Sequence, residues 1–355
     1  MKIRRLFGFV LATIFLYAAC KKDPSSPSDP DPEPIDTSMV EMIPYELVYN
    51  LHFPKPEPIP EDNQMFYERI WLGRKLFYDE RLSNTGESCA SCHFQSQGFA
   101  MDGVSEADKG LTSLPLVNLA WNKNFMWSGR IFGTLEDVMY VEVTERFHTD
   151  MEKINAIEEY RLMFRKYYGV KTITEHDLAK ALAQFLRTLI SKNTKFDRVL
   201  LGQEVLSPQE ELGRQLYFGE RGDCFHCHTI LFTSDNALHV NGLDAEYNKE
   251  IDYGYYNVSK NPEDKGRFRT PNLRNIALKN TFMHDGRFST LREVVEFYNS
   301  KVNLVPNIDP VMLKPNRVDG KLNLEEYEID ALVAFLHTFT DYDMIADTAF
   351  SNPNF

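Results

Sequence analysis

Two stretches of the chain, "LGRKLFYDERLSNTGESCASCH" at residues 72–93 and "LGRQLYFGERGDCFHCH" at residues 212–228, share one pattern. Each begins with Leu-Gly-Arg, a polar residue, Leu and two aromatic residues, and each then runs through a short loop into Cys-x-x-Cys-His. Self-similarity at a spacing of 140 residues indicates two copies of one module. The sequence therefore predicts two homologous domains in tandem.

The Cys-x-x-Cys-His motif that ends each copy is typical of covalent haem attachment. Two thiols three residues apart can add to the two vinyl groups of one haem, and the adjacent histidine can reach the haem iron. A four-cysteine zinc site or two disulfides are the alternatives, but zinc ribbons separate their cysteine pairs by only about 15–20 residues, and neither alternative needs the histidines. The predicted haem-binding residues are Cys89, Cys92 and His93 in the first copy and Cys224, Cys227 and His228 in the second.

The N-terminus has the composition of an export signal. The basic "MKIRR" is followed by the apolar run "LFGFVLATIFLYAA", which is too short to span a bilayer as a helix. We predict a signal peptide at 1–19 and a lipoprotein whose Cys20 carries the lipid; a plain signal peptide with a stray cysteine is the alternative. The Pro- and Asp-rich segment that follows predicts a disordered tether over 20–45. The protein is then expected on the periplasmic side, anchored to the membrane.

The rest of the chain is helical by pattern, with long irregular loops such as 232–270. Apolar residues recur at helical spacing over 178–189 and 329–336, and no convincing strand alternation is present. Four pairs have the spacing of a helix N-cap and its third residue: Thr174 and Asp177, Ser207 and Glu210, Thr290 and Glu293, and Asn323 and Glu326. We predict an all-α fold of two cytochrome c-like domains, over 46–200 and 201–345, each with one covalent c-type haem.

Charge narrows the range of partners. The formal net charge of -13 argues against nucleic acid or an anionic membrane surface as a binding partner, because both bind clusters of Lys and Arg. A basic or neutral protein partner is more natural.

The order of motifs resembles the bacterial di-haem cytochrome c peroxidases over roughly residues 60–340. Besides the two repeats, the resemblance rests on "WSGR", "KALAQFLRTLISKNTKFDRVL", "FRTPNLRNIALKNTFMHDGRFSTLREVVEFYN" and "IDALVAFLHTFT". The same superfamily includes MauG, which oxidises tryptophans in another protein. The resemblance implies two c-type haems with a calcium ion between them. It also implies that hydrogen peroxide is reduced at the N-terminal haem, with electrons that a small cytochrome c or copper protein delivers through the C-terminal haem. Family members often form homodimers.

The resemblance also identifies ligands, and here the sequence departs from the usual pattern. The family's peroxidases place a distal histidine some sixteen residues after the first motif, but no histidine occurs over 94–145, and Met101 is the only soft ligand near that position. The first haem is therefore expected to be five-coordinate or water-bound. At the second haem, the position fourteen residues after His284 holds Met in peroxidases and Tyr in MauG; here it is Tyr298, with Met283 as the competing ligand.

Three further roles follow from the resemblance. Trp127 of the "WSGR" motif corresponds to a tryptophan that lies between the haems. An acid/base is expected about twenty residues later in a VEM-like tripeptide, for which Glu145 and Asp150 are the candidates and His148 a substitute. The calcium ligand that is usually an Asn is Ser113 here, which leaves calcium in question.

Three functions compete. The first is a cytochrome c peroxidase, and the second is a MauG-like oxidase of a protein or organic substrate, favoured by Tyr298. The third is a non-enzymatic di-haem electron-transfer cytochrome, which would not react with peroxide.

Overall fold

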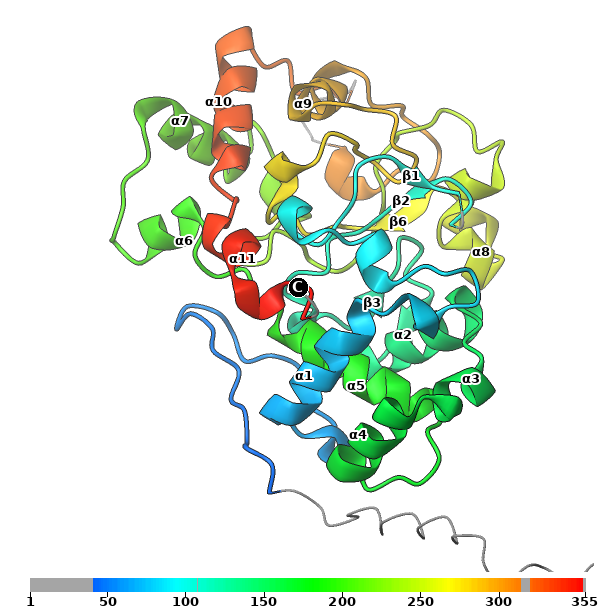
Figure 1. The fold of residues 1–355 in the computed structure, drawn as a ribbon. Helices are drawn as coiled ribbons and strands as arrows, with labels where there is room; N and C mark the ends of the chain where they lie inside the picture. Colours follow the sequence, from blue (N-terminus) through cyan, green and yellow to red (C-terminus); the bar gives the residue numbers. More distant parts are fainter. Residues whose placement is uncertain (1–40, 107, 314–319, 354–355) are drawn as a thin grey trace, which may run out of the picture. The chain divides into compact units, whose positions relative to one another are not determined.

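The two copies of the Leu-Gly-Arg repeat lie in helices α1 (Tyr67–Phe77) and α7 (Pro208–Tyr217), and each packs against a later helix. Helix α1 crosses α5 (Glu175–Thr188), and α7 crosses α10 (Glu326–His337), as Figure 1 shows. A Cβ atom on Gly73 would lie 1.9 Å from the carbonyl oxygen of Ala181, and one on Gly213 would lie 2.0 Å from that of Ala331. The repeated glycine therefore lets two helices meet backbone to backbone, and the two copies build equivalent helix pairs.

This computed structural model describes residues 41–106, 108–313 and 320–353. The predicted signal peptide, Cys20 and the tether as far as residue 40 lie outside the described residues. Within them, no helix has the length and apolar character needed to cross a membrane.

Helices dominate the part of the chain that the structure describes, in agreement with the predicted all-α fold. The remaining helices are α2 (Leu135–Val141), α3 (Met151–Ala156), α4 (Glu158–Tyr168), α6 (Lys195–Leu200), α8 (Tyr256–Ser259), α9 (Leu291–Ser300) and α11 (Tyr342–Ala346). A π-helix, η6 (Glu142–Arg146), continues α2. Among the described residues, sheet is confined to three short antiparallel pairs: β1 (Val104–Ser105) with β2 (Leu111–Thr112), β3 (Asn124–Phe125) with β4 (Ile131–Phe132), and β5 (Leu238–Val240) with β6 (Arg267–Arg269).

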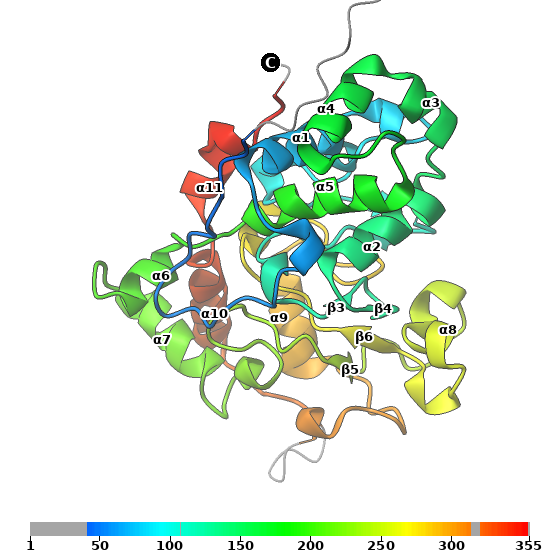
Figure 2. The ribbon, with the colours of Figure 1, turned by 90° about the horizontal axis from the view of Figure 1, so that it is seen from below.

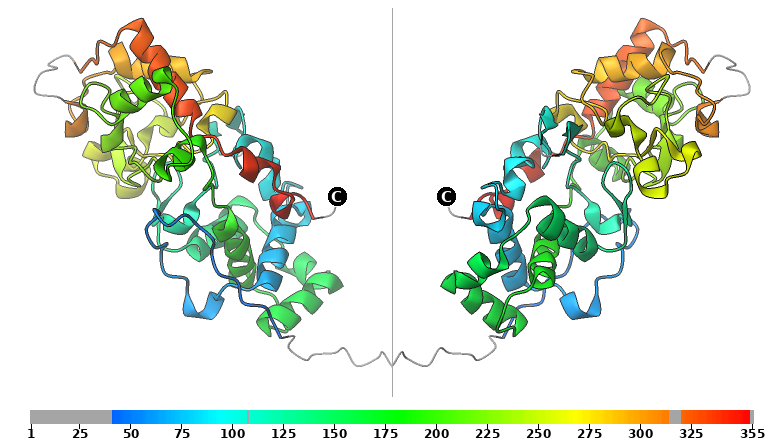
Figure 3. Two further views of the ribbon diagram at one scale, coloured as in Figure 1. Left: turned by 90° about the vertical axis from the view of Figure 1, so that its left-hand side faces the viewer. Right: turned by 90° about the vertical axis from the view of Figure 1, so that its right-hand side faces the viewer.

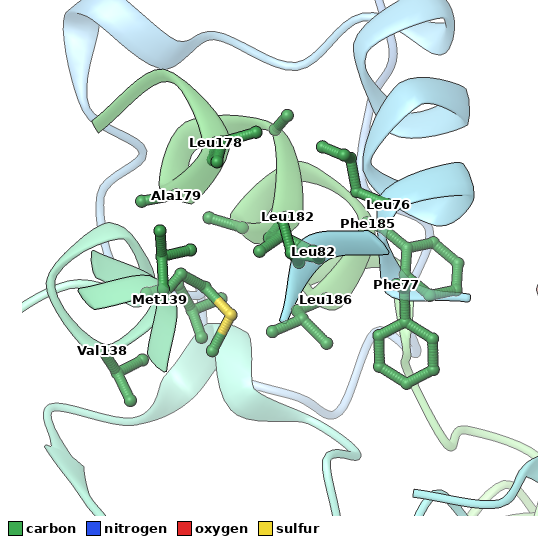
Figure 4. Packing of buried hydrophobic residues seen from close by; sticks show 14 of the residues in the cluster. Leu76, Phe77, Leu82, Val138, Met139, Leu178, Ala179, Leu182, Phe185 and Leu186 are labelled. Atoms are coloured by element: carbon green, nitrogen blue, oxygen red, sulfur yellow. The ribbon is translucent and has the colours of Figure 1, made fainter. Parts of the chain in front are cut away.

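Two large hydrophobic clusters surround the two helix pairs. In the first, α5 is buried along most of its length; Figure 4 shows its leucines facing Leu76 and Phe77 of α1, with Val138 and Met139 of α2 beside them. The second cluster runs from Phe196 to Phe339 and joins α7, α9 and α10. Figure 2 shows α1, α4 and α5 gathered apart from α6, α7 and α10. Most residues of the first cluster precede the predicted boundary at residue 200, and nearly all residues of the second follow it. Contacts nevertheless join residues 39–355 into one compact unit, so the domain limits stay a prediction.

The last described residues return to the first helix pair, beside α1 (Figure 3). Arg74 donates from Nε to the carbonyl oxygen of Ser351 at 2.6 Å, and the hydroxyl of Tyr78 donates to that of Phe350 at 2.7 Å. Met344 of α11 is part of the first hydrophobic cluster. The C-terminal segment therefore stabilises the N-terminal helix pair.

Three of the four predicted N-caps are confirmed as capping boxes, at Thr174, Ser207 and Thr290. The fourth is wrong by two residues. Asn323 has a φ of +53° outside the helix, and Glu325 caps α10 together with Glu328, whose carboxylate accepts from the Glu325 N–H at 2.8 Å. The Glu328 carboxylate also pairs with Arg221.

Candidate haem sites

Both Cys-x-x-Cys-His motifs fold into the same short turn. A 3-10 turn covers Cys89–Ser91 in the first copy and Cys224–His226 in the second. The N–H of His93 donates to the carbonyl oxygen of Cys89 at 3.0 Å, and His228 donates in the same way to Cys224 at 2.9 Å. All four cysteines are free thiols, so the disulfide alternative has no support.

The two histidine rings are held in the tautomer that a metal ligand needs. Nδ1 of His93 lies 2.9 Å from the carbonyl oxygen of Phe99, and Nδ1 of His228 lies 2.7 Å from that of Thr233. A carbonyl only accepts, so Nδ1 carries the proton and Nε2 keeps its lone pair for iron. Burial lowers the pKa of His93 to about 4 and lowers that of His228 as well, so both rings are neutral. The residues present fit a haem at each motif.

A buried cation nearby gives a second indication of haem. Arg269 is only 4% exposed, and its guanidinium donates to neutral acceptors: the carbonyls of Met126 and Thr270 and the side-chain oxygen of Asn236. Burial lowers its pKa to about 10, and among the described residues no carboxylate pairs with it. A buried charge is costly without a partner. The propionate groups of a haem are anions of the kind that this guanidinium needs.

Glu142 is the carboxylate closest in character to a peroxide acid/base, and the sequence analysis missed it. It begins the π-helix η6, a distortion that is frequent at functional sites. The pKa of Glu142 is raised to about 7, chiefly by burial and then by the charge of Asp108, while Arg146 opposes the shift. After burial, the charge of Glu142 is the next cause of the raised pKa of the Cys89 thiol, which places Glu142 beside the first Cys-x-x-Cys-His motif.

A sequence signal for Glu142 did exist. Residues 141–143 read Val-Glu-Val, a close match to the VEM-like tripeptide, but they lie fifteen residues after Trp127 instead of about twenty. Giving weight to the tripeptide over the count would have identified it.

The predicted acid/base residues lie in more exposed positions. The Glu145 side chain is 59% exposed and pairs with Arg130 at 2.9 Å. Asp150 caps α3 by accepting from the backbone N–H groups of Glu152 and Lys153, and the Lys153 N–H is the main cause of its lowered pKa. His148 is exposed, with a φ of +46°. Their assignment to peroxide chemistry stays a prediction.

Trp127, in the N-terminal half of the chain, contacts two aromatic residues of the C-terminal half. Its indole N–H donates to the carbonyl oxygen of Thr112 at 2.7 Å. Its ring centroid lies 6.4 Å from that of Phe268 and 6.4 Å from that of His284, and these two rings stack at 4.0 Å. His284 is held in turn by Asp252, 3.0 Å from its Nε2.

Tyr298 of α9 points to the second motif. Its hydroxyl oxygen accepts from Nδ2 of Asn241 at 3.0 Å. Burial raises the pKa of Tyr298 to about 12, and the thiols of Cys227 and Cys224 are close enough to add to the shift. The competing Met283 has a φ of +67°, and its carbonyl oxygen accepts from the hydroxyl of Thr112 at 2.7 Å. Ligation of iron by either residue stays a prediction.

Ser113 does not have the surroundings of a calcium ligand. Its hydroxyl accepts from the Met101 N–H at 2.7 Å, and its carbonyl oxygen accepts from the ammonium of Lys279 at 2.8 Å. Calcium prefers six to eight oxygen ligands, drawn from carboxylates, carbonyls and water. A lysine ammonium at this point opposes a second cation, so the calcium ion that the resemblance implies does not fit these residues.

Comparison with known proteins places this geometry in a family. The di-haem cytochrome c peroxidase family model matches residues 67–205. The methylamine utilization protein MauG of Methylorubrum extorquens is 33% identical over 303 residues, 81% of this chain and 82% of that protein. Cytochrome-c peroxidase IdrP1 of Denitromonas iodatirespirans is 30% identical over 329 residues, 80% of this chain and 85% of that protein.

Solved structures agree. A MauG-like protein associated with microbial copper homeostasis has a TM-score of 0.77 and 29% identity, and the match covers 87% of this chain and 100% of that one. The diheme peroxidase BthA from Burkholderia thailandensis shares the fold, with a TM-score of 0.65 and 20% identity, over 87% of this chain and 97% of that one. With its two Cys-x-x-Cys-His motifs and these relatives, the chain belongs to the di-haem cytochrome c peroxidase family, which also includes MauG.

Proposed function

We propose that this protein reduces hydrogen peroxide to water at the first haem site, between residues 46 and 200. The observation that carries the proposal is Glu142, a carboxyl with a pKa of about 7 beside the first haem attachment. When bound, haem supplies an iron that exchanges electrons with peroxide. The protein's own contribution is to hold that iron through His93 and to move protons.

Glu142 would move the proton that peroxide cleavage requires. One carboxylate oxygen accepts the proton from the oxygen nearer the iron and returns it to the far oxygen, which leaves as water. A pKa near the working pH suits this exchange, because the group must be both a base and an acid. The whole reaction takes two electrons and two further protons and gives two waters.

Electrons would enter through the second haem site, between residues 201 and 345. We infer that a small cytochrome c or copper protein delivers them, that His228 holds the second iron, and that Trp127 with Phe268 and His284 lies on the route between the sites. The contacts among these three aromatic rings support a role in electron transfer, and the rings also pack the two halves of the chain together. The predicted signal peptide and Cys20 would place the protein on the periplasmic side as a membrane-anchored lipoprotein.

Stopped-flow mixing of the haem-loaded protein with hydrogen peroxide tests the proposal. Glu142→Gln keeps the size of the side chain and removes its acid/base function, so the rate of reaction with peroxide should fall roughly 10²–10⁴-fold. Glu145→Gln and Asp150→Asn are the controls, and they should react at close to the wild-type rate. A wild-type protein that does not react with peroxide would instead support a pure electron-transfer cytochrome.

A second candidate function, MauG-like oxidation of a protein or organic substrate, is favoured by Tyr298. A phenolate ligand stabilises ferric iron and lowers the haem potential, whereas a thioether favours ferrous iron. A second haem with Tyr298 as ligand would be a poorer store for donor electrons and a better partner for oxidising a substrate. Peroxide-dependent turnover of a reduced small cytochrome c separates the two, because a peroxidase sustains it and a MauG-like oxidase does not.

A further inference from the structure

We propose that the ammonium group of Lys279 takes the place of the calcium ion expected between the two haem sites, so that this protein works without calcium. The ammonium donates to the carbonyl oxygen of Ser113 at 2.8 Å, across 166 residues of sequence. Ser113 is the residue that corresponds to the usual calcium ligand. The inference is independent of which substrate the protein oxidises.

Lys279 lies in a network that joins two loops, residues 101–113 and 279–284, which we call the haem junction. The Asn280 N–H donates to Oδ1 of Asp102 at 2.6 Å, and the Gly103 N–H donates to the Thr281 hydroxyl at 2.8 Å. Thr112 adds two more bonds, from its hydroxyl to Met283 and from its N–H to His284. The first loop follows His93, and the carbonyl of Thr112 fixes Trp127.

Lys279 is matched by one carboxylate, that of Asp102, and by one carbonyl, that of Ser113. Asp102 is the carboxylate that interacts with Lys279, and its oxygens are already engaged by the Asn280 N–H and by Nε2 of Gln97 at 2.8 Å. One carboxylate and one carbonyl suit a monovalent ammonium, whereas Ca²⁺ needs more oxygen ligands and more negative charge.

Lys279 also lacks the surroundings of an ordinary surface lysine. Burial lowers its pKa to about 8, and Asp102 offsets only part of the shift. A lysine usually keeps its ammonium in water, since its long side chain can reach it. Because the side chain is covalently part of the chain, the cation that it supplies to the haem junction cannot dissociate or be chelated.

The first experiment measures calcium directly on the haem-loaded wild-type protein. After desalting, elemental analysis should find no stoichiometric calcium. The thermal unfolding midpoint and the haem absorption spectrum should be the same in EGTA and in calcium chloride. One calcium per chain, or a lower midpoint in EGTA, would overturn the proposal.

The second experiment removes the cation. Lys279→Met keeps the length of the side chain but loses its charge and its hydrogen bond, so the unfolding midpoint should fall and electron exchange between the two haems should slow. Lys279→Arg, which keeps the charge, should recover part of both. The matched control is Lys109→Met, because Lys109 lies in the same loop, is 77% exposed and pairs with Glu250. Equal effects at both lysines would contradict a special role for Lys279; if Lys279→Met does not fold, the calcium measurement still decides.

Discussion

The indole N–H of Trp127 donates to the carbonyl oxygen of Thr112 at 2.7 Å, and the N–H of Thr112 donates in turn to the carbonyl oxygen of His284 at 2.8 Å. Thr112 thus connects the tryptophan, through its carbonyl, with His284, through its N–H, and the His284 ring stacks on Phe268. The ring is therefore held by residues on both sides of the haem junction. This fixed placement is what a relay between two redox centres requires.

Replacing Trp127 with Phe should separate the relay from the packing. The ring remains, but Thr112 loses its donor, at a cost of about 1–3 kcal/mol in the free energy of unfolding. Electron exchange between the haems, followed by stopped-flow absorption after reduction by a donor, should slow markedly.

Trp121→Phe is the matched control. Trp121 is buried, and its indole N–H likewise donates to a backbone carbonyl, that of Pro54 at 2.8 Å, but it lies in a separate cluster with Phe53 and Phe232. It should cost a similar amount of stability and leave electron exchange unchanged. If both variants slow the exchange equally, Trp127 is only packing.

The raised pKa of Glu142 predicts a pH dependence of the peroxide reaction. The ionised carboxylate is the base, so the second-order rate constant should rise as the pH passes through about 7 and level off above it. In Glu142→Gln the rate should be low and flat over the same range. A wild-type profile without this step would remove Glu142 from the mechanism.

The same raised pKa of Glu142 predicts that the folded protein loses stability as the pH rises, whereas the rate of the peroxide reaction increases. The folded protein binds the Glu142 proton more tightly than the unfolded chain, whose value is 4.5, so this contribution to stability is complete below about pH 4.5 and is lost as the pH rises through about 7. Glu142→Gln should lack this loss. Denaturant unfolding of both proteins at pH 5 and pH 8 measures the difference.

Sequence reasoning succeeded where a pattern has one physical reading. The Cys-x-x-Cys-His motifs predicted His93 and His228 as iron ligands, and both rings have Nδ1 bonded to a backbone carbonyl, which fits that role. The repeat predicted two copies of one module, and in the structure each copy lies in a helix whose glycine meets the backbone of a later helix.

It failed where geometry depends on a count along the chain. Glu142 was missed because the number of residues after Trp127 was taken as fixed. A loop between the tryptophan and the carboxylate can lose residues while both side chains keep their positions. Burial decides which of Glu142, Glu145 and Asp150 has a raised pKa, and periodicity within a seven-residue helix and a π-helix does not reveal burial. The pairing of Lys279 with Ser113 joins residues too distant in sequence for any local pattern.

Tyr298→Phe should show whether the phenol oxygen reaches the second iron. If Tyr298 is the ligand, the absorption spectrum of one haem changes and its reduction potential rises, because a phenolate stabilises ferric iron. Asn241 also loses its acceptor, so stability should fall by about 1–3 kcal/mol.

The control is Tyr168→Phe: the Tyr168 hydroxyl is buried without a hydrogen-bond partner among the described residues, so its loss should leave spectrum and potential unchanged. An unchanged spectrum in Tyr298→Phe would leave Met283 as the candidate.

The repeated glycines should be intolerant of even one added methyl group. In an isolated helix, alanine is more favourable than glycine by about 1 kcal/mol. Here a Cβ on Gly73 or Gly213 would lie 1.9 or 2.0 Å from a backbone carbonyl oxygen of the facing helix, so the helices must separate. Overpacking of this kind costs about 1–3 kcal/mol or more, which outweighs the gain in propensity.

Gly73→Ala and Gly213→Ala should both lower the thermal unfolding midpoint, whereas Gln215→Ala, at an exposed position of α7, should leave it nearly unchanged. Because α1 leads into the first haem motif and α7 into the second, each glycine variant should also perturb the spectrum of its own haem, and a variant that alters both or neither would contradict the view that each repeat builds one site.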